Sequence, residues 1–158
     1  MAKRTKRIAS ALETIRGVLS RAELTPTPLS DGMGYEAHFA NDGPEVRAEA
    51  HVFEEEKFAF YFEFVKRSPK KTLQQTMEFI TRANFDLLTG NFEMEIDSGV
   101  VRYKASLDFT GMDLTPLLVR NLILSAIYCV ETYSTALAAV MSGLKDPEQA
   151  VDDAEASA

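Results

Sequence analysis

The stretch Phe58-Ala59-Phe60-Tyr61-Phe62-Glu63-Phe64 decides the fold of this 158-residue chain. Every second residue is phenylalanine, and alternate residues of a β-strand point to the same side of a sheet. One sheet face therefore carries a row of aromatic rings, each of which buries a large apolar area when it is covered. The stretch predicts a core strand whose phenylalanine side is packed against other elements.

Two more strands are predicted immediately before this one. Apolar or small residues alternate with other residues over 33–40 and again over 46–52. The turn sequences 41–44 and 54–56 separate the three strands, and such short turns make neighbouring strands antiparallel. Direct closure of the first turn places His38 opposite Arg47, not opposite His51. We therefore interpret the two histidines as exposed strand residues, since zinc would also need a third and a fourth ligand.

A second hairpin is predicted around a two-residue turn at Ser98-Gly99, with Asp97 opposite Val100. A slip by one residue would set apolar residues against charged ones, so the alternation specifies the register strongly. The predicted pairs are Phe92 with Ala105, Met94 with Tyr103 and Ile96 with Val101 on the apolar face, and Glu93 with Lys104 and Glu95 with Arg102 on the charged face.

Three helices complete the predicted order. Apolar residues spaced four, three and four apart over 8–19 predict a first helix that ends near Ala22. Ser68-Pro69 is typical of a helix start, and Gly90 ends this second helix, on which Asn84 needs hydrogen-bond partners if it is buried. Its apolar face is predicted to hold Leu73, Met77, Ile80, Leu87 and Leu88. Thr115-Pro116 begins the last helix, which runs toward Gly143.

The last helix is apolar on more than one side. Its broad core face includes the single cysteine, Cys129, which excludes an internal disulfide and which we interpret as a small buried apolar residue. Four further apolar residues fall within about 100° of one another on the opposite side. These four residues, which we call the outer patch, are Leu117, Leu124, Ile127 and Tyr128. The patch is either an extra core contact with the first helix or, as we predict, an interface that meets itself across a two-fold axis in a homodimer.

The net charge and its distribution limit the classes of partner that we expect. The net charge of −7 argues against a general nucleic-acid or anionic-membrane binder. Two basic clusters stand against that average: the first 21 residues carry a net +5, and residues 66–71 add four positive charges. Neither cluster is interleaved with aromatic residues that could stack on bases, so we do not expect nucleic acid as a partner. The basic start could instead lie against the acidic residues of the C-terminal tail or against an acidic surface of a partner.

The sequence has few features of a targeting signal and few candidate catalytic or metal-ligating residues. Glu13 and Arg16 interrupt the segment that follows the basic start, so it does not form the apolar core of a signal peptide. The uncharged stretch between Arg120 and Glu131 is about half of the roughly 20 residues that span a bilayer. We therefore expect a cytoplasmic protein without membrane contact. With two histidines, one cysteine and no phosphate-binding glycine pattern, we expect no catalytic site, no metal and no cofactor.

The hairpin region resembles a known family. Ala83-Asn84-Phe85-Asp86-Leu87-Leu88-Thr89-Gly90-Asn91-Phe92-Glu93-Met94-Glu95-Ile96-Asp97, followed by Gly99-Val100-Val101-Arg102-Tyr103, is similar to the YbjN-like family. Leu114-Thr115-Pro116, leading into the helix that ends in Met141-Ser142-Gly143, is similar to it too, so the resemblance covers about residues 45–145. That family looks like the class I type III secretion chaperones in fold, usually as homodimers. The resemblance implies a non-enzymatic regulator or chaperone-like module, with no catalytic residues to carry over.

These observations predict one α+β domain over residues 1–145 with an acidic, flexible tail over 146–158. The domain has a single antiparallel sheet of about five strands with helices on one face, in the order α-β-β-β-α-β-β-α and type III secretion chaperone-like. We expect a chaperone-like or regulatory protein-binding module that is a homodimer and buries a protein or peptide client in apolar grooves or along a sheet edge. The alternative is a small-ligand-binding domain or enzyme with a pocket between the phenylalanine row and the helices.

Overall fold

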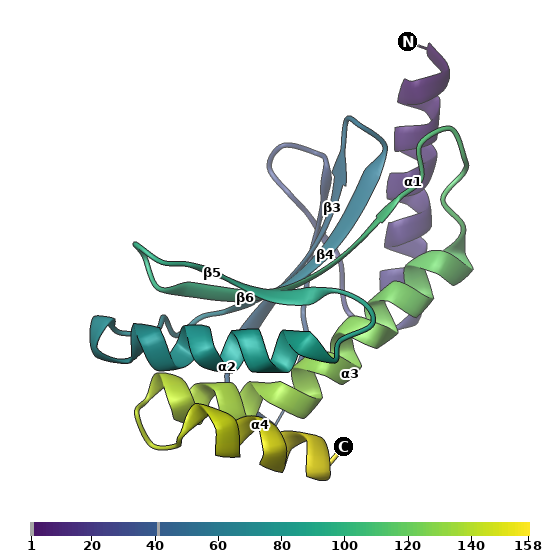
Figure 1. The fold of residues 1–158 in the computed structure, drawn as a ribbon. Helices are drawn as coiled ribbons and strands as arrows, with labels where there is room; N and C mark the ends of the chain where they lie inside the picture. Colours follow the sequence, from purple (N-terminus) through teal and green to yellow (C-terminus); the bar gives the residue numbers. More distant parts are fainter. Residues whose placement is uncertain (1, 41) are drawn as a thin grey trace.

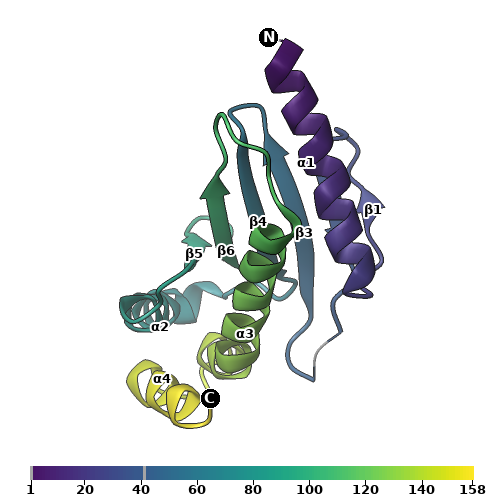
Figure 2. The same cartoon turned by 90° about the vertical axis from the view of Figure 1, so that its right-hand side faces the viewer.

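In the computed structural model, which describes residues 2–40 and 42–158, six antiparallel strands form one sheet in the order β1-β2-β3-β4-β6-β5. Helices cover one side of this sheet (Figure 1), and in Figure 2 α1 and α3 lie in front of the strands. The elements are α1 (Ala2–Arg21), β1 (Thr27–Pro28), β2 (Gly34–Ala37), β3 (Val46–Phe53), β4 (Lys57–Phe64), the 3-10 turn η1 (Lys70–Thr72), α2 (Leu73–Phe85), β5 (Asn91–Glu95), β6 (Val100–Asp108), α3 (Pro116–Met141) and α4 (Pro147–Ala156).

The predicted α+β class and single antiparallel sheet are confirmed, with one strand more than expected. The proline-containing segment after α1, predicted as a loop, contributes the two-residue strand β1, which pairs with β2. Because β1 sits at the sheet edge, Pro28 can join the sheet without a hydrogen-bond donor. The predicted register of β2 on β3 is confirmed, with Tyr35 opposite Ala50 and Ala37 opposite Ala48. Within the intervening turn, Asn41 lies outside the described residues.

The phenylalanine row of β4 forms the middle of the core. Phe58, Phe60 and Phe62 are completely buried, and Phe64 is nearly so. The row is enclosed because β4 lies between β3 and β6 while α3 packs across both β4 and β6. These rings occupy the space in which the small-ligand alternative required a pocket, so that alternative is contradicted.

The hairpin of β5 and β6 differs from its predicted register by two residues. Glu93 lies opposite Arg102, where the sequence predicted Lys104. The difference arises at the turn, because the Glu95 carboxylate accepts hydrogen bonds from the backbone N–H groups of Asp97 and Ser98, at 3.2 and 2.7 Å. This makes the loop longer than two residues. A shift by two keeps each side chain on its predicted face, so the apolar and charged faces are as expected.

Helix α2 begins later and ends earlier than predicted. Ser68 does not cap it; instead its hydroxyl is bonded to the Thr76 hydroxyl at 2.8 Å, in a buried position. The helix ends at Phe85, which leaves the predicted face residues Leu87 and Leu88 in the following loop. Its buried face also differs from the prediction, since Met77 is exposed. The buried residues of η1 and α2 are Thr72, Thr76, Phe79, Ile80 and Ala83.

The acidic tail is a packed helix, so the prediction of a flexible C-terminal segment is wrong. Asp146 caps α4 by accepting hydrogen bonds from the N–H groups of Glu148 and Gln149. Ala150, Val151 and Ala154 are buried, and α4 contacts both α2 and α3. The acidic residues occupy only the outer face of an amphipathic helix whose inner face consists of small apolar residues.

Helix α1 is held at its basic end by the turn between β3 and β4, not by the tail. Arg4 lies 3.5 Å from Glu54, and Arg7 donates to Glu56 at 2.5 Å. These ion pairs offset the cost of placing positive charges at a helix N-terminus, where the helix dipole disfavours them. Arg4 and Arg7 therefore pair with this turn and not with the acidic tail.

Candidate functional site

The outer patch lies on α3, on the side of this helix that the sheet does not cover. Thr115 caps the helix by accepting from the Leu118 N–H at 3.3 Å, and Pro116 occupies its first turn. Leu117, Tyr128 and Leu124 are 60%, 59% and 48% exposed. Ile127 is only half-buried and packs against the core, so it belongs partly to the extra core contact that the sequence left open. Figure 2 shows α3 between α1 on one side and α4 on the other.

This side of α3 is almost uncharged. Of its 26 residues only Arg120 and Glu131 carry charge, and both side chains are exposed. In the part of the chain that the structure describes, neither forms an ion pair. Our reading of the sequence placed both residues on the solvated side of the helix without connecting them. Their separation of eleven residues, close to three helical turns, is the signal that it missed.

A groove of about 430 Å³ runs along one side of the outer patch. We call it the Tyr128 groove, since Tyr128 belongs both to its wall and to the patch. Leu88, which is 99% exposed, and Leu87 contribute from the loop after α2. Two hydrogen bonds fix its walls, between the hydroxyls of Thr89 and Ser125 at 2.5 Å and from Tyr133 to Glu155 at 2.8 Å. Its other lining residues are Asp86, Cys129, Thr132 and Ala158.

By length and composition alone, α3 could also cross a membrane. Ten of its residues are nevertheless buried within the fold, among them Val119, Ile123 and Val130. A core helix of a soluble domain passes the same test of length and composition, and burial of one whole face against a sheet is typical of that class. The exposed apolar residues of α3 therefore form a stripe along one side of a core helix.

Charged side chains occupy the sheet face that the helices leave open. Glu93 accepts from Arg102 at 2.6 Å and from Lys104 at 2.9 Å, and the Arg102 guanidinium lies 4.6 Å from the centre of the Tyr61 ring. Burial alone would raise the pKa of Glu93, but the hydrogen bonds from Lys104 and Arg102 outweigh it and lower this pKa. Arg102 and Lys104 both have Glu93 as an acidic partner and stay partly exposed, in agreement with the predicted solvated face.

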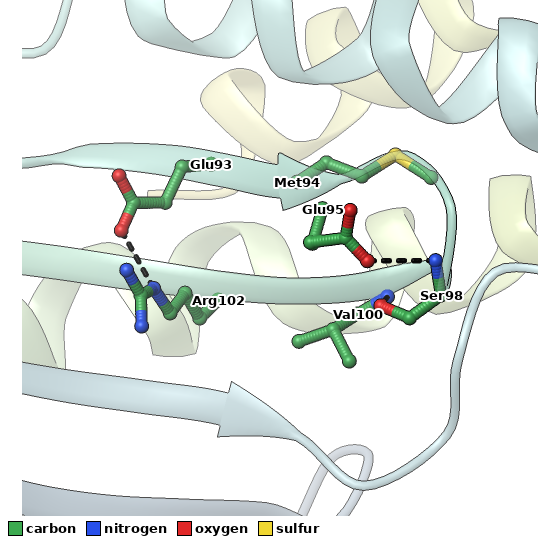
Figure 3. Close-up of a pocket in the computed structure, with 6 residues that line it drawn as sticks. All are labelled: Glu93, Met94, Glu95, Ser98, Val100 and Arg102. Atoms are coloured by element: carbon green, nitrogen blue, oxygen red, sulfur yellow. Dashed lines mark hydrogen bonds and ion pairs between the residues drawn. The ribbon is translucent and has the colours of Figure 1, made fainter.

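Figure 3 shows the hollow of about 400 Å³ at the hairpin end of this face, next to the Glu93–Arg102 pair. Glu95 points toward the backbone of Ser98, to which it is bonded, and Met94 and Val100 complete the rim. Both carboxylates are thus already satisfied within the hairpin, which leaves the hollow without a free charged group to recognise a ligand.

The outer edge of β5 is closed at Phe92, near the start of the strand. The Asn84 side chain accepts from the Phe92 N–H at 2.7 Å and donates to the Phe92 carbonyl at 2.8 Å. These are the partners that the sequence required for Asn84. They occupy the outward main-chain groups of Phe92, which disfavours client binding at this end of the sheet edge.

The remaining candidates for chemistry are not assembled into a site. His51 lies 3.5 Å from Glu49 and 3.9 Å from Asp31, but no group of three metal-ligating side chains occurs among the described residues. Cys129 is buried, and this burial raises the pKa of its thiol despite a hydrogen bond with Tyr103. A thiol with a raised pKa is a poor nucleophile, in agreement with its interpretation as a core residue.

The chain is similar to one protein family and to a solved structure. A family model, YbjN, with the description "Putative bacterial sensory transduction regulator", matches residues 11–139. Among solved structures, the chain is similar to one titled "Crystal structure of YbjN, a putative transcription regulator from E. coli". The TM-score is 0.56 at 14% identity, covering 84% of this chain and 90% of that one, and this likeness shows the fold. No curated protein matches the chain.

Proposed function

The chain belongs to the YbjN family, and from this membership together with the geometry of α3 we propose that it is a regulatory protein-binding module acting as a homodimer. The family description supports the regulatory role. The outer patch supports the binding role, because exposed apolar clusters on soluble proteins mark partner sites.

One observation carries the homodimer: Leu117, Leu124 and Tyr128 stand exposed along a single helix side that carries almost no charge. A two-fold axis places the same surface on both copies, so one apolar stripe is enough to form the whole interface. The half-buried Ile127 connects this stripe to the core and gives it a rigid base. A second copy covers apolar surface that is otherwise left in water.

Beyond the second copy, the client is a protein or peptide. The net charge of −7 disfavours nucleic acid and anionic membranes, and the closed edge of β5 disfavours strand addition there. An apolar segment held in the Tyr128 groove is the mode of binding that remains. We propose a chaperone-like, non-enzymatic protein that needs no cofactor and acts in the cytoplasm.

Light scattering after size exclusion tests the homodimer. We expect the wild-type chain to have the mass of a dimer at high micromolar concentration and Leu124→Glu to have the mass of a monomer, because the change buries a charge in the interface. Ile96→Glu is the matched control, since Ile96 is also an exposed apolar residue but lies in the β5–β6 loop. A monomeric wild-type chain would overturn the homodimer, and a dimeric Leu124→Glu variant would overturn the role of the patch.

A further inference from the structure

We propose that two copies of the chain pair their α3 helices antiparallel, so that Arg120 of each copy contacts the partner's Glu131 across the outer patch. This inference rests on the homodimer proposed above and adds its orientation and register. It commits to a second copy of this chain as the occupant of the outer patch.

The first argument is the order of residues along the outer side of α3. Arg120, Leu124, Ile127 and Glu131 are spaced four, three and four residues apart, and this spacing is the same when it is read backwards. Eleven residues turn an α-helix by three turns and about 20°, so the two charges lie on one side of the helix about 16 Å apart. The two apolar residues lie between them.

Charge then selects the direction of pairing. In an antiparallel pair centred between residues 125 and 126, Arg120 faces the partner's Glu131 twice, and Leu124 faces the partner's Ile127. In a parallel two-fold pair each charged residue would face its own copy, which sets Arg120 beside Arg120 and Glu131 beside Glu131. Like charges in contact disfavour that arrangement, so the antiparallel one is preferred.

Both charged groups are available for this contact. In residues 2–40 and 42–158 no carboxylate pairs with Arg120 and no cation pairs with Glu131. Glu131 also lines a hollow of about 440 Å³ together with Asp42, Ser134 and Thr135. A guanidinium that reaches this hollow therefore meets the carboxylates of Glu131 and Asp42 and the exposed hydroxyl of Thr135.

The Tyr128 groove stays outside this contact. Leu118 is 46% exposed and lies seven residues before Ser125, which places it on the groove side of α3. At 100° per residue this side is turned by more than 90° from Arg120, Leu124, Ile127 and Glu131, so pairing along those four residues leaves the groove open.

Charge reversal tests the register. We expect Arg120→Glu and Glu131→Arg each to raise the dimer Kd about tenfold or more, since each dimer then contains two like-charge contacts. The double variant R120E/E131R restores opposite charges only in the antiparallel pair, and we expect its Kd to return close to that of the wild type. Arg47→Glu is the matched control, because Arg47 is an exposed arginine on the open sheet face. Analytical ultracentrifugation measures each Kd, and thermal unfolding confirms that each variant is folded.

The outcomes separate this register from the homodimer itself. If Leu124→Glu gives a monomer but the charge reversals leave the Kd unchanged, the register is overturned while the homodimer stands. If both single reversals weaken the dimer and the double variant weakens it further, pairing is not antiparallel and the register is again overturned. A monomeric wild-type chain would overturn both proposals.

Discussion

Arg7 in α1 donates from Nε to the buried carboxylate of Glu56, 49 residues later, at 2.5 Å. The same carboxylate accepts from the Gly111 N–H at 3.1 Å, and the Glu56 carbonyl accepts from Phe109 at 3.0 Å. Glu56 therefore joins the basic end of α1, the β3–β4 turn and the loop before α3. It does so from a left-handed backbone conformation, with φ at 59°, which costs energy for a residue with a side chain.

We expect Glu56→Gln to lower the denaturant midpoint and to flatten its dependence on acid pH. The hydrogen bond from Arg7 is the main cause that lowers the pKa of Glu56 below its ordinary value, against an opposing effect of burial. A lowered pKa stabilises the fold above the unfolded value of about 4.5, and this stability is lost as the pH falls through the folded pKa. Urea unfolding between neutral pH and about pH 3 measures both effects. Equal midpoints for variant and wild type at every pH would contradict the prediction.

Gly90→Ala should be far more destabilising than Gly32→Ala, although both glycines have φ near 70°. A Cβ atom at Gly90 would overlap the Tyr103 hydroxyl and lie 2.7 Å from the Lys104 carbonyl, whereas at Gly32 it meets no atom within 4 Å. The Gly32 change therefore costs only the left-handed conformation, about 1 kcal/mol, and the Gly90 change adds steric overlap in the core. Chemical denaturation of the two variants compares them directly. Similar losses would show that Tyr103 moves aside freely.

Asn84→Ala should destabilise the fold by about 1–3 kcal/mol and promote aggregation. It removes both hydrogen bonds to Phe92 and leaves main-chain groups unpaired on the edge of β5. Unfolding experiments give the first quantity, and light scattering during incubation at high concentration gives the second. Gln75→Ala, an exposed change on the same helix, is the control. If the Asn84 variant stays as monodisperse as the control, Asn84 does not protect the edge of β5 against aggregation.

Val151→Asp should unfold part of the C-terminal region and lower the overall stability by several kcal/mol. Val151 is buried on the inner face of α4, and an unpaired buried charge is among the most destabilising changes. Asp152→Ala removes a neighbouring exposed carboxylate and should have little effect. Limited proteolysis with mass spectrometry would report cleavage within residues 146–158 in the first variant only. Equal cleavage of the wild-type chain would mean that α4 is not stably packed.

The sequence predicted most of the sheet because its signals there are redundant. The phenylalanine row of β4 specifies both a strand and its buried side, and the register of β2 on β3 follows from a short turn. The second hairpin shows the limit of such reasoning, since its apolar alternation defines the face but not the register. The Glu95 carboxylate accepts hydrogen bonds from two backbone N–H groups and so lengthens that turn. The alternation of apolar and charged residues cannot predict these hydrogen bonds.

The helices were harder to predict where polar residues enter the core. Thr72 and Thr76 are buried because their hydroxyls donate to the carbonyls of Met141 and Thr72, at 2.9 Å in each case. A hydrophobicity pattern treats both as surface residues and so misplaces the face of α2. Two of the four buried residues of α4 are alanines, whose small apolar surface gives a weak signal beside the five acidic residues of the tail.

The candidate site was predictable in part. The angular positions of Leu117, Leu124 and Tyr128 identified an exposed stripe, and the structure places them together on the uncovered side of α3. The same positions could not show that Ile127 also contacts the core, because that depends on the angle between α3 and the sheet. Nor could they reveal the groove, whose wall includes Leu88 from a loop that the sequence assigned to α2.

The strand order has a consequence for synthesis on the ribosome. Strand β4 pairs with β6, which ends at Asp108, and the helix that covers both begins at Pro116. A nascent chain that has just released the phenylalanine row must therefore wait for more than fifty further residues before the row can be enclosed. Translation adds about 5–20 residues per second, so this aromatic edge is open to other nascent chains for several seconds. Binding of a cellular chaperone to the phenylalanine row during this interval would protect it until β6 and α3 are released.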